Sequence, residues 1–303
     1  MAMDEWRYDT ASDLDQTITE RLRRFPREPD MMMYGIRSLA ALGIRAWLRT
    51  YHRLEMIGRE YLPTEGSYVL VGNHTSHLDC LCLLSILPWR KVHRACPAAA
   101  TDYFFTSALR ITVGAVVMNA LPFDRQIFRF RQSLRLCKEV LANPGNVLII
   151  FPEGTRSVTG EIEEFKPGIG LLLAGANVPV LPCHLAGAFE ALPKGRVLPQ
   201  PVRLRLMIGA PRNFAALPPG KSSALRVCQE LRQAVLELAA VNRKKSSPAE
   251  TIHPADRSHL GHPLPSGADL REGWRERRFP FFGVGHLRRV FKSDKNPFAA
   301  ACE

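Results

Sequence analysis

The chain has 303 residues, of which 46% are hydrophobic, and this is enough to bury a sizeable core in one or two domains. Its formal net charge of +12 favours an anionic partner, which can be nucleic acid, a membrane surface or an acidic small molecule. The seven cysteines are odd in number and contain no CxxC pair, which predicts reduced, buried thiols in a cytosol-facing protein rather than a disulfide framework.

The amino-terminal part divides into two segments. Residues 1–30 have mixed charge, lack a secretory signal and predict a loosely ordered lead-in. Residues 31–54 contain no acid, and Arg45, Arg49 and Arg53 recur every four residues, as on one face of a helix. Such a basic amphipathic helix predicts contact with a membrane surface. The alternative is a helix that packs on the domain and keeps a solvated arginine face.

From about residue 55 to residue 245, strand and helix patterns alternate. Apolar runs predict strands at 67–72, 92–96, 113–118, 146–151, 178–184 and 202–208, and helices are expected at 78–87, 102–110, 126–142, 167–176 and 221–243. This alternation predicts an α/β fold with a mostly parallel, twisted sheet covered by helices. The uncharged stretch 167–189 is interpreted as a buried helix and strand, not as a membrane span.

The composition changes again after residue 245. Residues 246–270 are rich in Ser, Pro, His and Gly, which predicts a disordered linker. Residues 271–292 are basic and aromatic, and such a tail fits anionic lipid, nucleic acid, a protein partner or plain solvent. The sequence therefore predicts three parts, at 1–54, 55–245 and 246–303.

A His and an Asp five residues apart, His74 and Asp79, follow the apolar strand that ends near Gly72. Open α/β sheets bind ligands at the carboxyl ends of their strands. There a neutral imidazole can act as a base when a carboxylate holds its other ring nitrogen. One alternative is an Asp that only caps the following helix. Another is a metal site formed with His77, which lacks the i, i+4 spacing of zinc motifs.

A second polar turn, residues 151–157, follows the strand predicted at 146–151. Gly154 lets a ligand approach the backbone closely, and Arg156 can hold a phosphate through two parallel hydrogen bonds. Thr155 and Ser157 add hydroxyl donors, while Glu153 could orient the arginine or accept a substrate hydroxyl. The alternative is a surface turn with a salt bridge.

Two further stretches complete the pattern. Residues 121–124 are expected to form a loop that carries a second arginine, Arg125. Residues 178–182 combine a β pattern with Pro179 and Pro182, and they predict a structural wall of a pocket rather than chemistry.

In this order the four stretches resemble the sequence blocks of the glycerolipid acyltransferases, which include glycerol-3-phosphate and lysophosphatidic acid acyltransferases. The residues that carry the resemblance are His74-Thr75-Ser76-His77-Leu78-Asp79, Pro122-Phe123-Asp124-Arg125, Phe151-Pro152-Glu153-Gly154-Thr155-Arg156-Ser157 and Val178-Pro179-Val180-Leu181-Pro182. The resemblance covers roughly residues 55–245, which would form the catalytic domain.

The resemblance implies transfer of an acyl group from acyl-CoA or acyl carrier protein to a glycerolipid hydroxyl, at the cytosolic side of a membrane. His74 would be the general base and Asp79 would orient it, without an acyl-enzyme, a metal or a bound cofactor. The acceptor would lie against a larger set of residues: Arg125, Glu153, Gly154, Thr155, Arg156 and Ser157. The protein would be peripheral or monotopic, on anionic lipid.

The chain departs from the family pattern at residues 97–105, where members often carry a basic residue and this loop is acidic and aromatic. The expected acceptor is a lysophospholipid, 1-acylglycerol-3-phosphate, and the alternatives are another lysolipid, a lipid alcohol or a catalytically silent lipid-binding protein. No nucleic-acid partner is expected, since zinc-finger, RNA-recognition and helix-turn-helix signatures are lacking.

Overall fold

The computed structural model describes residue 25 and residues 31–100, 111–124 and 127–246. In these ranges seven strands form one sheet in the order β1-β7-β6-β2-β5-β3-β4. The strands are β1 (Glu55–Ile57), β2 (Tyr68–Gly72), β3 (Ala95–Ala100), β4 (Leu121–Phe123), β5 (Val147–Ile150), β6 (Val180–Ala186) and β7 (Arg205–Ile208). Neighbours are parallel except β6 and β7, so the predicted α/β fold with a mostly parallel sheet is confirmed.

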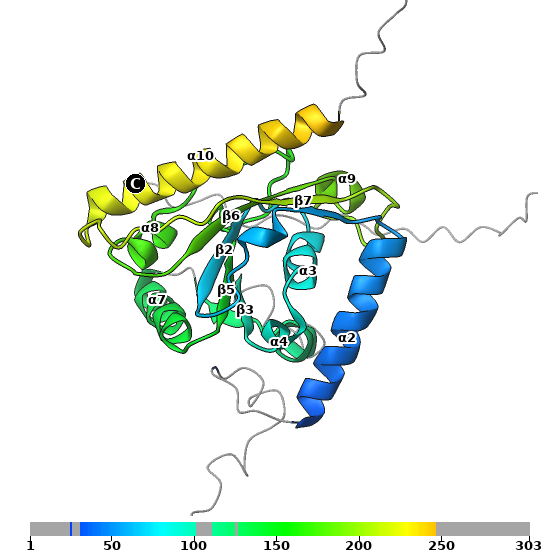
Figure 1. Ribbon diagram of the computed structural model, residues 1–303, viewed down its shortest axis with the longest axis horizontal. Coiled ribbons are helices and arrows are strands. Elements are labelled where there is room, and N and C mark those ends of the chain that lie inside the picture. The colour runs from blue at the N-terminus through cyan, green and yellow to red at the C-terminus, as the bar shows by residue number, and fades with distance from the viewer. Residues whose placement is uncertain (1–24, 26–30, 101–110, 125–126, 247–303) are drawn as a thin grey trace, which may run out of the picture. The chain divides into compact units, whose positions relative to one another are not determined.

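Helices cover both faces of this sheet (Figure 1). They are α2 (Met31–Thr50), α3 (Leu78–Ser85), α4 (Trp89–Val92), α7 (Ile127–Ala142), α8 (Pro167–Leu173), α9 (Ala188–Ala191) and α10 (Lys221–Ser246), with short turns η1 (Arg59–Tyr61) and η2 (Val113–Val117). Tyr68 and Leu70 of β2 join a core with α2, α3 and α9, while Val69 and Val71 join a core with α7, α8 and α10. This alternation places β2 between two apolar layers, as its uninterrupted apolar sequence predicts.

The central strands β2 and β5 position the two polar turns. They are parallel neighbours in a register that pairs Val71 with Ile150. Because parallel strands end at the same edge of a sheet, the residues that follow them, 73–79 and 151–157, emerge side by side.

Two local predictions were wrong, both between β3 and α7. Residues 113–118 do not form a strand: residues 113–117 form the π-helical turn η2, because a short apolar run does not distinguish a buried helix from a buried strand. Residues 121–123 are not a loop but the edge strand β4, which pairs with β3 and tolerates Pro122 at the edge. The helix expected at 102–110 lies outside the described residues.

The orientation of α2 also differs from the prediction. The helix ends at Thr50, and Arg53 lies beyond it with a positive φ of 48°, so the expected arginine stripe does not form. Arg45 donates from Nη2 to the carbonyl oxygen of Leu87 (2.5 Å), and its guanidinium lies 5.0 Å from the ring centroid of Trp89.

A second arginine of α2 is turned inward as well. Arg37 is 7% exposed and donates to the carbonyl oxygens of Val116 (2.8 Å, from Nε) and Ala115 (3.1 Å, from Nη2). The outward surface is instead apolar and includes Met31, Met32, Ile36, Leu39 and Leu42. None of the helices in the described ranges is long and apolar enough to span a bilayer.

Of the remaining sequence expectations, two are confirmed and the others lie outside the described residues. The stretch 167–189 forms the buried helix α8 and the strand β6, as predicted. Six cysteines in the described ranges are buried, also as predicted. The lead-in at 1–30, apart from residue 25, and the linker and tail after residue 246 lie outside the described residues.

Candidate active site

The first polar turn joins β2 to α3 and brings His74 onto Asp79. The carboxylate oxygen Oδ2 of Asp79 lies 2.9 Å from Nδ1 of His74 and also accepts the backbone N–H groups of Thr75 (2.7 Å) and Ser76 (2.8 Å). Asp79 is only 1% exposed. Asp79 therefore holds the turn before α3 and the imidazole at once. The alternative of an Asp that only caps the following helix is wrong, because its hydrogen bonds go to residues that precede the helix.

The contact with Asp79 also sets the tautomer of His74. An ionised carboxylate can only accept hydrogen bonds, so the proton between the two groups resides on Nδ1 of His74. Nε2 is then left as a proton acceptor, which is the form that a general base requires.

The turn is tied to its neighbours by two further side chains. Asn73 exchanges hydrogen bonds with the backbone of Leu185 on β6, at 3.1 Å to the carbonyl oxygen and 2.8 Å from the N–H. Ser76 donates from Oγ to the carbonyl oxygen of Leu192 (2.8 Å) and accepts the N–H of Leu78 (3.1 Å). These buried contacts leave the backbone around His74 little freedom.

The second polar turn packs directly against His74. The ring of Phe151 stacks on the imidazole, with centroids 4.3 Å apart and planes 18° apart. Oε1 of Glu153 accepts the backbone N–H of His74 (2.9 Å), and the N–H of Ser157 donates to the carbonyl oxygen of His74 (2.7 Å). Gly154 makes the turn possible, because its φ of +73° is unfavourable for residues with a side chain.

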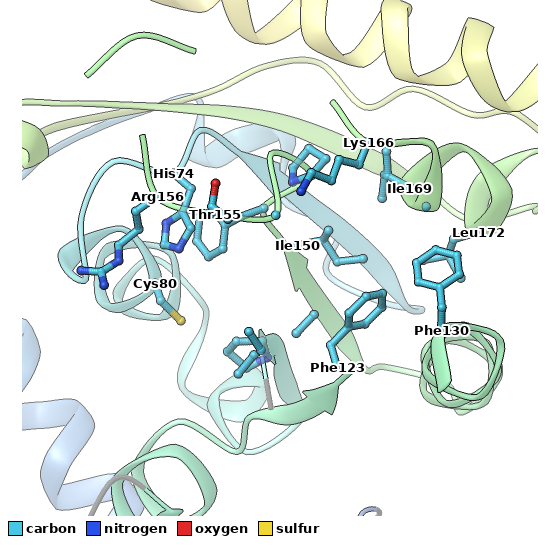
Figure 2. Close-up of a pocket in the computed structure, with 18 of the residues that line it drawn as sticks. His74, Cys80, Phe123, Phe130, Ile150, Thr155, Arg156, Lys166, Ile169 and Leu172 are labelled. Carbon is cyan, nitrogen blue, oxygen red and sulfur yellow. The ribbon is translucent and has the colours of Figure 1, made fainter. Parts of the chain in front are cut away.

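A cavity of about 630 Å³ opens in front of His74. Its polar lining gathers around the two turns and includes His74, His77, Thr155, Arg156, Lys166 and Lys194, whereas its apolar lining includes Phe123, Phe130, Leu134, Ile150, Ile169 and Leu172. Figure 2 shows Arg156 and Thr155 beside His74, with Phe123, Phe130 and Leu172 farther along the cavity. No Asp or Glu is among the described lining residues, so the cavity suits an anionic, largely apolar molecule.

The residues predicted to bind substrate do not all reach this cavity. Gly154, Thr155 and Arg156 line it, as does His74, but Glu153 and Ser157 are buried behind the turn and do not. Arg125 lies outside the described residues. The prolines of 178–182, predicted to form a pocket wall, do not line the cavity either.

Two lysines of the cavity were not among the predicted site residues. Lys166 directly precedes α8, and its side chain crosses the second turn so closely that a Cβ at position 154 would lie 3.1 Å from Nζ. A signal for Lys166 was present in the sequence, since this residue stands next to a Pro-Gly helix start soon after the second turn. Lys194 follows α9, and only the folded chain brings it to the cavity.

Burial changes the proton affinity of two groups near His74. It raises the pKa of Glu153 from 4.5 to about 7; the N–H groups of His74 and Glu163 oppose this shift, and the charges of Asp79 and Glu163 add to it. Burial also raises the pKa of the Cys80 thiol, which lines the cavity. Cys80 therefore stays protonated at neutral pH and is a poor nucleophile.

Comparison with known proteins agrees with this arrangement. The acyltransferase family model matches residues 53–186. A 1-acyl-sn-glycerol-3-phosphate acyltransferase of Chlamydomonas reinhardtii is 30% identical over 192 residues, 61% of this chain and 52% of that protein. The human 1-acyl-sn-glycerol-3-phosphate acyltransferase alpha is 31% identical over 133 residues, 43% of this chain and 44% of that protein.

A solved structure shares the fold. The crystal structure of the 1-acyl-sn-glycerophosphate (LPA) acyltransferase PlsC from Thermotoga maritima is 24% identical, and the match covers 68% of this chain and 80% of that one with a TM-score of 0.53. The family match covers residues 53–186, and the solved structure shows that the fold is shared. The chain spans about half the length of the curated relatives it matches, and those named here are 1-acyl-sn-glycerol-3-phosphate acyltransferases.

Proposed function

We propose that this protein transfers an acyl group from an acyl thioester to the free hydroxyl of a lysophospholipid, 1-acylglycerol-3-phosphate. The observation that carries the proposal is the His74–Asp79 pair, which lies at the end of an apolar cavity where the cations gather. The names of the related proteins support the choice of acceptor.

In this reaction Nε2 of His74 takes the proton from the acceptor hydroxyl while the oxygen attacks the thioester carbonyl. The tetrahedral intermediate then collapses, the carbon–sulfur bond breaks, and the leaving thiolate takes the proton back from His74. The products are an ester and a free thiol, either CoA or carrier protein. Asp79 stabilises the imidazolium that forms between the two steps.

The lining of the cavity fits the two ends of such a lipid. The apolar side chains around Phe123 and Phe130 suit an acyl chain, and Arg156 and Thr155 beside His74 suit a phosphate. Residues 97–100 of β3 line the cavity without a cation, and Lys166 and Lys194 supply positive charge from other elements. This charge supports a phosphate monoester as the acceptor in spite of the departure at 97–105.

Replacement of the base tests the proposal. Purified His74→Ala should lose at least ~10²-fold in acyl transfer to 1-acylglycerol-3-phosphate, because the hydroxyl no longer has a proton acceptor. His93→Ala is the control, since His93 contacts α2 residues Tyr34 and Ser38 outside the cavity. Full activity of His74→Ala would contradict the mechanism. A wild-type protein that binds lysolipids but turns over no thioester would support a silent lipid-binding protein.

We further propose that α2 brings the protein to the cytoplasmic face of a membrane that contains anionic lipid. The support is its outward apolar surface, where Leu39 is 72% and Leu42 is 59% exposed. Transfer of each side chain from water to an apolar environment is worth roughly 1.5–3 kcal/mol. The double variant Leu39→Glu/Leu42→Glu should therefore float poorly with vesicles, while Leu198→Glu, which changes an exposed leucine of a loop, should float normally.

The division of the chain follows from these assignments. We propose that residues 1–54 contact the membrane, residues 55–245 form the catalytic domain, and residues 246–303 form an appended tail. Deletion of residues 246–303 tests whether the basic tail adds to binding. Residues 31–54 pack into the core through Leu48 and Leu54, so their membrane role is tested by the leucine variants in the folded protein.

A further inference from the structure

The second polar turn forms hydrogen bonds with both the backbone N–H and the backbone C=O of His74. Oε1 of Glu153 accepts the N–H, and the N–H of Ser157 donates to the C=O. Phe151, in the same turn, stacks on the imidazole. Three residues of one turn thus contact backbone and ring of the proposed base.

We infer that Glu153 is a positioning residue, which fixes the main chain of His74 so that the imidazole stays on Asp79, and that it does not bind the acceptor. The inference rests on the proposed function, in which His74 is the base. It differs from the expectation drawn from the sequence, where Glu153 would contact the acceptor or Arg156.

The surroundings of Glu153 exclude a direct contact with the acceptor in this arrangement. The residue is 2% exposed, and it is absent from the cavity lining although its neighbours Pro152 and Gly154 belong to it. Its other oxygen, Oε2, is also buried and makes no hydrogen bond of standard geometry within the described residues. The carboxyl group therefore points into the protein, toward the backbone of His74.

The contact does not require a charged carboxylate. The pKa of Glu153 is raised to about 7, so both protonation states are populated near neutral pH. A protonated carboxyl keeps an acceptor oxygen, as does an amide. Glutamine at this position should therefore preserve the contact, and alanine should abolish it.

The residues on the two sides of this turn therefore have different roles. Thr155 and Arg156 line the cavity, whereas the Glu153 carboxyl and the Ser157 backbone N–H bond to the main chain of His74. Loss of Arg156 should raise the acceptor KM, and loss of Glu153 should lower kcat. A displacement of the reacting group by about 1 Å is enough to lower a rate by about 10²-fold.

The test compares Glu153→Ala, Glu153→Gln and Arg156→Met in the full-length protein, with Glu161→Gln as a surface control for loss of an acid. Glu153→Ala should lower kcat by roughly 10²-fold with an acceptor KM within about threefold of wild type. Glu153→Gln should recover most of kcat. Arg156→Met should show the opposite pattern, with a raised KM, and Glu161→Gln should match the wild type.

Amide hydrogen exchange of His74 gives a second readout that does not depend on activity. The His74 amide should exchange up to roughly tenfold faster in Glu153→Ala and at nearly the wild-type rate in Glu153→Gln. An unchanged rate in Glu153→Ala would overturn the inference, as would a raised KM with normal kcat, or a glutamine variant as impaired as the alanine one. Failure of the proposed function would appear separately, as an inactive wild type or an active His74→Ala.

Discussion

The paired turns at 73–79 and 151–157 and the helix α2 both direct polar side chains into the protein, but the sequence reveals this only for the turns. In the turns, His74 and Asp79 are five residues apart and find each other locally. In α2, Arg37 reaches carbonyl groups near residue 116, at a sequence separation of 79. The comparison teaches that periodicity predicts where a helix forms, while distant hydrogen-bond partners decide which face it buries.

The same contrast explains why α2 is apolar on the outside. Carbonyl groups just beyond the last turn of a helix lack intrahelical partners, and Arg45 satisfies one of them at Leu87, after α3. Arg37 and Arg45 of this basic segment are therefore used within the domain. Contact with a membrane, if α2 provides it, depends on the leucines and methionines.

The largest effect is expected from Asp79→Asn, which tests the local pair. An amide cannot both accept the three N–H groups that meet at Oδ2 and favour the correct tautomer of His74. By analogy with hydrolytic triads, kcat should fall by roughly 10²–10⁴-fold. Steady-state kinetics with 1-acylglycerol-3-phosphate measures this, and a fall below about fivefold would argue against an orienting role for Asp79.

A second prediction concerns the buried acid of the turns. Because the folded-state pKa of Glu153 is about 7 against 4.5 when unfolded, the folded form binds a proton more tightly. This group therefore favours folding below pH 4.5, and that contribution is lost as the pH rises to about 7. As the pH rises between these limits, the free energy of unfolding of the wild type should fall by up to roughly 3 kcal/mol relative to that of Glu153→Gln.

Urea unfolding of both proteins at pH 5 and pH 8 measures that difference, and Glu161→Gln controls for the general loss of a surface acid. Equal pH dependence in wild type and Glu153→Gln would show that the carboxyl is more hydrated than its burial indicates.

A smaller effect is expected for the inward arginine of α2. Arg37→Met removes the donors to the carbonyl oxygens of Val116 and Ala115, and leaves them buried without these bonds. The free energy of unfolding should fall by about 1–3 kcal/mol. Arg49→Met on the exposed side of the same helix should change it by less than about 0.5 kcal/mol, and similar values for both would contradict the inward orientation.

The smallest effect is expected at the rim of the cavity. Lys166→Met should raise the acceptor KM about five- to tenfold, roughly 1 kcal/mol, because one cation near the proposed phosphate position is lost while the proposed base is untouched. Lys221→Met, at the exposed start of α10, is the matched control. A lowered kcat with unchanged KM would place Lys166 in a different role.

The sequence by itself determined the central strands β2 and β5 and the turns that follow them, and it predicted the pairing of His74 with Asp79 beside a capping and a metal-site alternative. These features depend on short apolar runs and on contacts between residues close in the chain, which periodicity and spacing report directly. The same reasoning identified Gly154, Thr155 and Arg156, because residues after parallel strands must share one edge of the sheet.

Only the tertiary structure decided the rest. It turned Glu153 away from the cavity, brought Lys194 into it, made 113–117 a helical turn and directed Arg37 and Arg45 of α2 into the domain. In each case a buried polar or apolar group had several partners of the right chemistry in the sequence. The packed sheet and helices determined which of these partners came within hydrogen-bond or van der Waals distance. A local sequence pattern does not report distances between residues that are far apart in the chain.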